Sequence, residues 1–353
     1  MRFRNSPFTR RAIFGLLPLL LIALLWRIAG QRPTHLPGLG GRVTAIAFSP
    51  DGKTIVCASD NGLAQVWKPE IKKWRSFLHP AYSAANWGLT HLIITRDGRA
   101  LIGGGSTISS PSIWGQFDIW DMKTRREYPN LHFYSNDFDV AGDGARFASS
   151  FPDGIGIFRL DLSNPQWKSS STSPSPLILN KAVHILSGSG NGQAPTFSSD
   201  GSHIATFAAG NLLIYDLSRN AKVQRILAQK AQQPTGAGWI GNLQNLAWSS
   251  DGKLIAAIFD SALVLWRADG TSLGSVALSN TAPVVSGVRR SIAFAPDSQS
   301  LAVGDENVQL WSVPDLKLRR TIKAPGPIAF SPDGKTLASG GANGAPEVLL
   351  WKL

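Results

Sequence analysis

One phrase stands near both ends of the chain. "AFSPDGKTIVCASDNGLAQVWK" covers residues 47–68, and "AFSPDGKTLASGGANGAPEVLLWK" covers residues 329–352. At its centre an Asp-Gly pair separates two short apolar runs, which is a strong local signal for a β-hairpin. A third apolar run follows and ends in an aromatic residue. Each copy therefore predicts at least three short strands in succession.

Degraded copies of the phrase lie between these two, so that it occurs seven times at a spacing of roughly 36–57 residues. The turn pairs are Asp51-Gly52, Asp97-Gly98, Asp143-Gly144, Asp200-Gly201, Asp251-Gly252, Asp297-Ser298 and Asp333-Gly334. The third runs end at Trp67, Trp120, Phe158, Tyr215, Trp266, Trp311 and Trp351.

A fourth strand fits into most of the gaps between copies. We expect it at residues 75–78, 127–133, 177–180, 223–227, 273–278 and 319–322. Four strands recurring seven times are typical of radial repetition. The sequence therefore predicts an all-β chain folded as a seven-bladed β-propeller of four-stranded blades.

The ends of the repeat indicate how the ring closes. The last copy reaches only its third strand at Trp351, and an open ring would leave an unpaired β edge. Residues 33–38 precede the first copy, and we expect them to supply the fourth strand of the C-terminal blade. The chain would then enter the ring on the side of the Asp-Gly turns.

The phrase "AFSPDGKTLASGG…VLLWK" resembles WD40 repeats of the bacterial style, and the resemblance covers residues 33–353. TolB-like propellers have similar "SPDG" turns, but the third strands ending in Trp favour WD40. Two family features are weak. Only Trp120-Asp121 spells the name-giving dipeptide, and Leu39 stands where the first repeat of the family has the His of its Gly-His pair. Apolar strand packing is therefore expected to replace the family's Asp–His network.

The chain divides into a basic N-terminal tail (1–11), an apolar segment (12–30) and the propeller (31–353). The apolar segment approaches the ~20 residues that cross a bilayer, and we expect a transmembrane helix or signal anchor. Arginines precede it, which predicts a cytoplasmic N-terminus and a propeller outside the cytoplasm. The alternatives are a cleaved signal peptide and a twin-arginine export signal at residues 9–14, both giving a secreted or periplasmic protein.

Charge and chemistry narrow the function. Half of the net charge of +12 lies in residues 1–32. The other basic clusters (68–75, 123–126, 317–323) are short and scattered, so we interpret them as solvated faces. We therefore expect that the chain does not bind nucleic acid. The six histidines show no metal-ligand spacing, Cys57 is the single cysteine, and no nucleophile elbow or P-loop occurs. We expect no catalytic residue, metal or small-molecule cofactor.

Three insertions are expected on the side opposite the Asp-Gly turns, at residues 78–89, 105–116 and 228–242. Each carries one tryptophan (Trp87, Trp114 and Trp239), and aromatic residues on loops are preferred anchors of interfaces. We interpret these as candidate contacts to a protein partner; the alternative is that they fold inward over the insertions. The predicted function is a non-enzymatic interaction scaffold. A propeller enzyme or carbohydrate-binding protein with a site in the channel mouth, and a structural subunit of an envelope assembly, remain alternatives.

Overall fold

The computed structural model describes most of the predicted propeller. The described residues are 32–68, 70–77, 89–105, 116–125, 137–142, 144–151, 154–159, 184–186, 193–208, 210–217, 224–230, 243–278, 290–341 and 344–353. Within these ranges no helix has the length and apolar character needed to span a membrane. The basic tail 1–11 and the apolar segment 12–30 lie outside the described residues.

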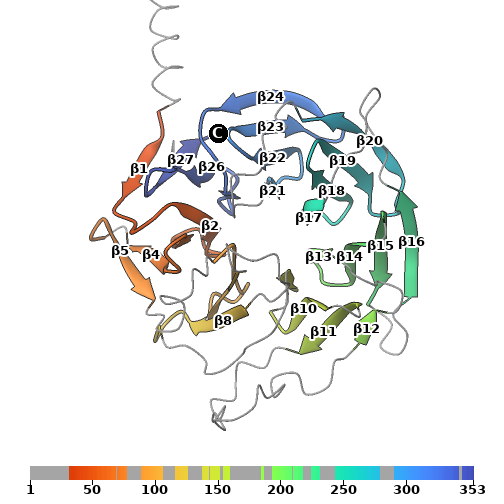
Figure 1. Cartoon of the computed structure of the whole chain (residues 1–353), viewed down its shortest axis with the longest axis horizontal. Coiled ribbons are helices and arrows are strands. Elements are labelled where there is room, and N and C mark those ends of the chain that lie inside the picture. Colours follow the sequence, from red (N-terminus) through yellow and green to blue (C-terminus); the bar gives the residue numbers. More distant parts are fainter. Residues whose placement is uncertain are drawn as a thin grey trace, which may run out of the picture.

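Seven antiparallel sheets stand around a common centre as the blades of a propeller (Figure 1). Blade 1 contains β2 (Val43–Phe48), β3 (Ile55–Ser59), β4 (Ala64–Lys68) and β5 (Lys73–Phe77). Blade 2 contains β6 (His91–Ile94), β7 (Ala100–Gly105) and β8 (Gln116–Asp121). Blade 3 contains β9 (Phe138–Val140), β10 (Arg146–Phe151), β11 (Gly154–Arg159) and β12 (His184–Leu186).

Blade 4 contains β13 (Gln193–Phe197), β14 (His203–Ala208), β15 (Asn211–Asp216) and β16 (Gln224–Lys230). Blade 5 contains β17 (Leu243–Trp248), β18 (Leu254–Phe259), β19 (Ala262–Arg267) and β20 (Ser272–Ala277). Blade 6 contains β21 (Ser291–Phe294), β22 (Ser300–Gly304), β23 (Val308–Ser312) and β24 (Lys317–Ile322).

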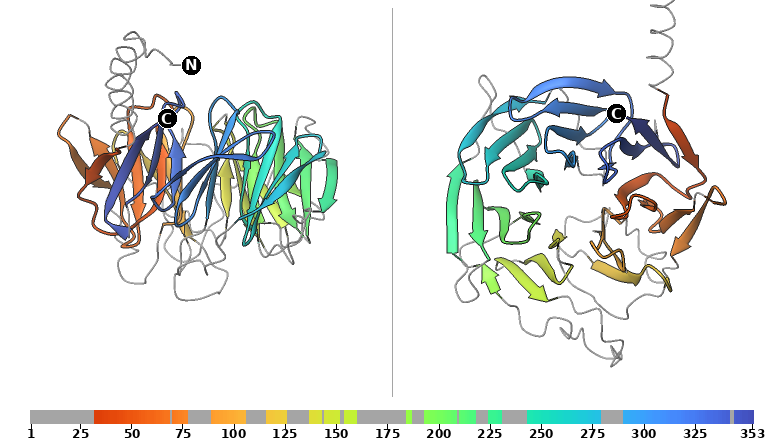
Figure 2. Two further views of the ribbon diagram at one scale, coloured as in Figure 1. Left: turned by 90° about the horizontal axis from the view of Figure 1, so that it is seen from above. Right: turned by 180° about the vertical axis from the view of Figure 1, so that it is seen from behind.

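Blade 7 joins the two ends of the described chain. It contains β25 (Ile328–Phe330), β26 (Thr336–Gly340), β27 (Glu347–Lys352) and, as its outer strand, β1 (Thr34–Pro37). β1 is antiparallel to β27, and both views in Figure 2 place it beside the C-terminal blade. This is the pairing expected of residues 33–38, and it covers the outer edge of β27.

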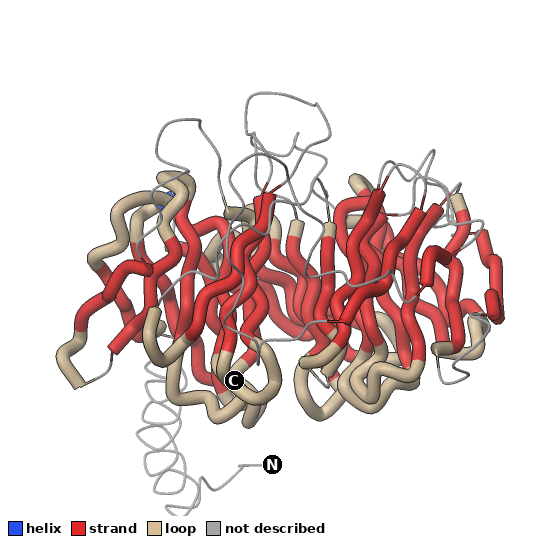
Figure 3. The backbone as a smooth tube through the Cα atoms, turned by 90° about the horizontal axis from the view of Figure 1, so that it is seen from below, coloured by secondary structure: helices blue, strands red, loops and turns tan. Residues whose placement is uncertain are grey.

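The strand register also fixes the side on which the chain enters the ring. Thr34 pairs with Leu350, close to Lys352, and Lys352 in turn pairs with Thr336 directly after the turn at Asp333. We call the side with the first-to-second and third-to-fourth strand connections the turn face, and the opposite side the loop face. Figure 3 shows short turns gathered on one side of the strands. The chain enters β1 from the turn face.

The hydrophobic core is divided into clusters between neighbouring blades, because each sheet buries both of its faces. Trp266 in blade 5 is fully buried and packs in one cluster with Leu212 and Ile214 of blade 4. Leu36 of β1 packs with Trp67 and Trp74 of blade 1 in the same way. Six of the seven predicted third-strand aromatics are buried: Trp67, Trp120, Phe158, Tyr215, Trp266 and Trp311. Trp351 is partly buried.

One predicted strand is wrong. The fourth strand of blade 3 is β12 (His184–Leu186), which pairs with β11 through Ile155 and Leu186, and not residues 177–180. Both are short apolar runs in one long insertion, and only the pairing partner distinguishes them. The fourth strand predicted for blade 2 at residues 127–133 lies outside the described residues.

Candidate interaction surface

The turn face is built from a repeated hydrogen-bonded turn. In five blades a hydroxyl two residues before the turn aspartate donates to that carboxylate at 2.5–2.6 Å. The pairs are Ser49–Asp51, Thr95–Asp97, Ser198–Asp200, Ser249–Asp251 and Ser331–Asp333. The same hydroxyl accepts the backbone N–H five residues after it, and the carboxylate accepts the N–H two residues after it. Each turn is therefore stabilised by hydrogen bonds from its own side chains.

These hydrogen bonds keep the turn carboxylates charged. The Ser198 hydroxyl is the main cause that lowers the pKa of Asp200 to about 2, followed by the backbone N–H of Ser202. The Ser49 hydroxyl lowers the pKa of Asp51 in the same way, and the Ser331 hydroxyl that of Asp333. Gly52 and Gly334 have φ of 70°, a left-handed conformation that glycine adopts without strain. The turn face thus carries fixed negative charges at regular intervals.

On the loop face, different donors occupy the place of the family's histidine. In blade 1, Leu39 is buried in the core, and the backbone N–H of Arg42 donates to Asp60 at 2.9 Å. In blade 5 the Gln244 amide donates to Asp260 at 2.6 Å. The expected absence of histidine therefore does not remove polar links to the second-to-third strand turns.

Blade 6 has the most buried of these links. Arg290 is 3% exposed and lies 3.1 Å from the carboxylate of Asp305, while its other terminal nitrogen donates to the carbonyls of Phe259 and Asp260. Burial raises the pKa of Asp305 despite the opposing charge of Arg290. This arginine bonds to blade 5 and blade 6 together, which makes it a structural link.

The first strands of blades 2 and 3 place three titratable side chains, His91, Asp137 and Asp139, at or next to their ends or within them. His91 lies 3.9 Å from Asp137, and Asp137 is buried and accepts the backbone N–H of Ala194 at 3.2 Å. Asp139 accepts the N–H of Phe197 at 2.7 Å, and burial raises its pKa to about 6. Both carboxylates bond blade 3 to blade 4. Among the described residues, no three His, Cys, Asp or Glu side chains form a group that could hold a metal ion.

The structure does not test the tryptophans that are predicted to contact a partner. Trp87, Trp114 and Trp239 lie outside the described residues, as do most of the insertions that carry them. Their role stays a prediction.

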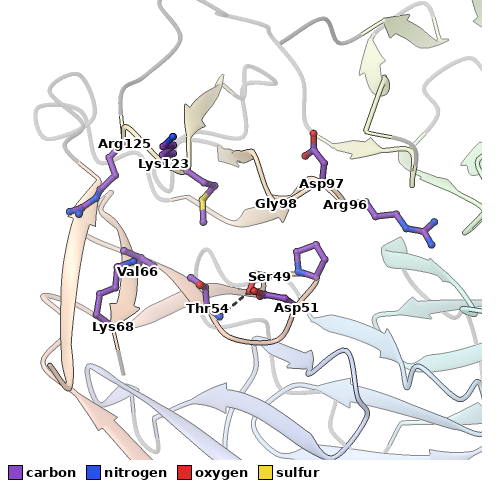
Figure 4. A pocket seen from close by; sticks show the side chains of 12 residues that line it. Ser49, Asp51, Thr54, Val66, Lys68, Arg96, Asp97, Gly98, Lys123 and Arg125 are labelled. Atoms are coloured by element: carbon purple, nitrogen blue, oxygen red, sulfur yellow. Dashed lines mark hydrogen bonds between the residues drawn. The ribbon is translucent and has the colours of Figure 1, made fainter. Parts of the chain in front are cut away.

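The described turn face contains a cleft that the sequence analysis did not anticipate. It lies between blades 1 and 2, has a volume of about 460 Å³ and is lined by the two first-to-second strand turns and both third-strand ends. Lys68, Arg96, Lys123 and Arg125 surround it (Figure 4). Figure 4 shows Lys68 and Arg125 on one side of the cleft and Arg96 on the other. The cations therefore form a rim instead of converging on one point.

The four cations of this rim outnumber the two carboxylates, Asp51 and Asp97, that line the cleft with them. None of the four cations lies within ion-pair distance of a carboxylate among the described residues. Asp51 and Asp97 also line the cleft, but their carboxylates accept hydrogen bonds from their own turns. Chemically, the cleft suits an anionic group.

A signal for this cleft was present in the sequence. The basic clusters at 68–75 and 123–126 both start at or just after the end of a third strand, so the propeller brings Lys68, Lys123 and Arg125 to the turn face of adjacent blades. Interpreting them as separate solvated faces overlooked that adjacency.

Comparison with known proteins agrees with this architecture. The family model "WD domain, G-beta repeat" (WD40) matches residues 30–68. No curated protein matches the sequence. Among solved structures, the β-propeller domain of Cps50 (Swd1) from Myceliophteria thermophila is 17% identical with a TM-score of 0.63, over 91% of this chain and 98% of that one. A chain in the mitotic checkpoint complex is also 17% identical with a TM-score of 0.63, over 91% of each chain. The chain is thus a seven-bladed β-propeller, and its residues 30–68 match the WD40 repeat model.

Proposed function

We propose that the chain is a non-enzymatic scaffold, anchored in a membrane by residues 12–30, that presents its propeller to a protein partner outside the cytoplasm. The loop face would look away from the membrane and carry Trp87, Trp114 and Trp239. The turn face would lie toward the bilayer.

One observation carries this proposal. β1 (Thr34–Pro37) closes the ring and follows the apolar segment after a few residues, so an anchor at 12–30 would be joined to the last blade at the turn face. The interblade clusters support a rigid platform, since those of the described residues join six of the seven neighbouring pairs of blades. One similar structure comes from a multiprotein assembly, the mitotic checkpoint complex, which favours a protein partner.

Anchoring is tested by washing native membranes with alkaline carbonate. The wild-type chain should stay in the pellet, whereas Leu20→Arg/Leu21→Arg should be released, because each charge near the bilayer centre costs about 3 kcal/mol. Release of the wild-type chain would contradict the anchor.

Location is tested with an impermeant maleimide. Lys53→Cys and Asn307→Cys place a thiol on the turn face and loop face at exposed positions, while native Cys57 is fully buried. Both sites should react in right-side-out vesicles and stay unreactive in sealed inside-out vesicles. The reverse pattern would place the propeller in the cytoplasm.

Partner binding is tested by crosslinking and purification from native membranes. One specific protein should be recovered with the wild type and lost with Trp87→Ala/Trp114→Ala/Trp239→Ala, provided that the thermal unfolding of the variant is unchanged. Equal recovery would remove these tryptophans from the interface.

A further inference from the structure

The geometry points to a second membrane contact: we propose that the turn face of blades 1 and 2 docks on an anionic phospholipid surface. The inference rests on the proposed anchoring, because it assigns the patch of the turn face that would meet the bilayer. Four observations carry it.

The first is an imbalance of charge around the ring. The turn connections of blades 1 and 2 and the strand ends beside them hold twice as many cations as carboxylates. The cations are Lys53, Lys68, Lys72, Lys73, Arg96, Arg99, Lys123 and Arg125; the carboxylates are Asp51, Glu70, Asp97 and Asp121. In blades 5 and 6 the cations are Lys253, Arg267 and Lys317, against Asp251, Asp269, Asp297 and Asp315. The turn face is therefore positive on blades 1 and 2 and slightly negative on blades 5 and 6.

The second is the state of the cations around the cleft. Lys68, Arg96, Lys123 and Arg125 have no carboxylate of the described residues within ion-pair distance, whereas Lys253 and Lys317 lie 3.6 Å and 3.2 Å from Asp251 and Asp315. Binding an external anion at the cleft therefore breaks no ion pair within the described part of the chain. A rim of separated cations suits several headgroups in a plane better than one small ligand.

The third is an apolar side chain among these cations. Ile71 lies in the connection between β4 and β5 and is 45% exposed, with Lys68, Lys72 and Lys73 close by in the chain. Exposed apolar residues surrounded by lysine and arginine are the combination that binds membrane interfaces.

The fourth is the position of the chain entry. β1 starts at the turn face and packs against blade 1 through Leu36, whose carbonyl accepts the Trp74 indole N–H at 3.4 Å. The entry point thus lies on the same face as the cationic patch and next to it. An anchored chain would hold this patch at a high effective concentration near the lipid surface.

The test uses the full chain in nanodiscs, with an environment-sensitive fluorophore at Ile71→Cys or, as the loop-face control, Asn307→Cys. Phospholipids carrying a nitroxide on the headgroup serve as quenchers. In discs containing phosphatidylglycerol, quenching at position 71 should exceed quenching at 307 several-fold. It should fall to the control level in pure phosphatidylcholine discs and in 0.5 M salt, where charges are screened beyond roughly 4 Å. Equal quenching at both positions in anionic discs would overturn the proposal.

Matched charge variants show whether the patch itself is responsible. Arg96→Gln/Lys123→Gln/Arg125→Gln should reduce the ratio of docked to undocked propeller by on the order of 100-fold, because each cation near an anionic surface contributes about fivefold. Lys253→Gln/Arg267→Gln/Lys317→Gln removes the same charge from blades 5 and 6 and should leave quenching at position 71 within twofold of wild type. Equal loss of quenching in both variants would show that docking depends on the overall positive charge and not on this patch.

Two further results separate the possible sources of phosphate and the two proposals. Inorganic phosphate should compete no better than chloride of equal ionic strength; stronger competition would overturn surface docking in favour of a discrete phosphate site. Loss of the chain from uncharged discs would contradict the anchor. Retention in anionic discs without quenching at position 71 above the level of position 307 would contradict only the docking.

Discussion

The turns of blades 5 and 6 are neighbours with the same backbone path and different side-chain chemistry. In blade 5, the hydroxyl of Ser249 donates to Asp251 at 2.6 Å and accepts the N–H of Leu254 at 2.9 Å. Gly252 follows the aspartate with φ of 70°, and its N–H bonds the Ser249 carbonyl at 2.9 Å. Every element of the repeated turn is present.

In blade 6, two of those elements are replaced. Ala295 stands where the serine would be, and Ser298 takes the place of glycine with φ of 58°. The backbone bond remains, from the Ser298 N–H to the Ala295 carbonyl at 2.9 Å, and Asp297 still accepts the N–H of Gln299 at 2.8 Å. The two turns also touch, because the Asp251 N–H donates to the Ser298 hydroxyl at 3.1 Å.

The difference separates what shapes the turn from what stabilises it. The backbone hydrogen bond and the aspartate are common to both blades, so they set the chain path. The hydroxyl and the glycine are dispensable for shape, and their contribution is expected in the free energy of unfolding and in its pH dependence.

The largest expected effect is on acid stability, because protonation weakens all five hydroxyl–carboxylate turns together while blade 6 has no such hydroxyl. The pKa of Asp200 is lowered to about 2 from 3.8, and those of Asp51, Asp97, Asp251 and Asp333 are also lowered. A lowered folded-state pKa gives stability that is present above the unfolded value and lost as pH falls through the folded value. The urea midpoint should therefore fall steeply between about pH 4 and pH 2.

Asp139 should have the opposite effect on the pH dependence of stability, at higher pH. Its folded-state pKa of about 6 exceeds the unfolded 3.8, so its contribution is lost as pH rises from about 4 to 6. Urea midpoints from pH 2 to 7 should peak near pH 4–5. Asp139→Asn should flatten the upper limb and Ser198→Ala should reduce the lower one; a midpoint independent of pH would contradict both assignments.

The next effect is that of the missing hydroxyl itself. Ser249→Ala makes blade 5 resemble blade 6 and should lower the free energy of unfolding by about 1–3 kcal/mol, because it leaves the Leu254 N–H without its acceptor in a buried turn. Ser250→Ala, at the exposed neighbouring position, should change stability by less than about 0.5 kcal/mol. Calorimetry at pH 7 measures both. Equal losses would show that the hydroxyl contributes nothing specific.

The comparison also shows what could be predicted from the sequence. The turns at Asp251-Gly252 and Asp297-Ser298 are both confirmed, even though the second lacks glycine, because an aspartate between two apolar runs is a local signal. The buried third-strand aromatics follow from the same pattern. Most of the fold could therefore be predicted from local patterns in the sequence.

The remaining features depend on contacts between blades. β12 could not be located because two apolar runs in one insertion were equally suitable, and pairing with β11 decides between them. Arg290 bonds to carbonyls about thirty residues away, and the cationic cleft combines side chains from two repeats. A periodic pattern identifies which strands recur, but it does not assign roles to side chains that differ between repeats.

A smaller effect is expected from restoring the hydroxyl in blade 6. Ala295→Ser places a donor next to Asp297 and an acceptor next to the Ser300 N–H, as Ser249 does in blade 5. Ala295 is 5% exposed, so the new hydroxyl must give up water, and the net gain should be about 0.5–1 kcal/mol. Destabilisation in chemical unfolding would mean that the site has no room for the extra oxygen.

The smallest effect is expected at Ser298, where two contributions oppose each other. Glycine would relieve a left-handed conformation that costs an L-residue about 1–2 kcal/mol. It would also lose the hydrogen bond from Asp251, worth about 0.5–1.5 kcal/mol, and increase the entropy of the unfolded chain. Ser298→Gly should therefore lie within about 0.5 kcal/mol of wild type, whereas Ser298→Ala loses the bond, keeps the conformation and should be destabilised by about 1 kcal/mol. If the alanine and glycine variants are equally stable, backbone strain at this turn is negligible, and the preference for glycine in the other blades needs a different cause.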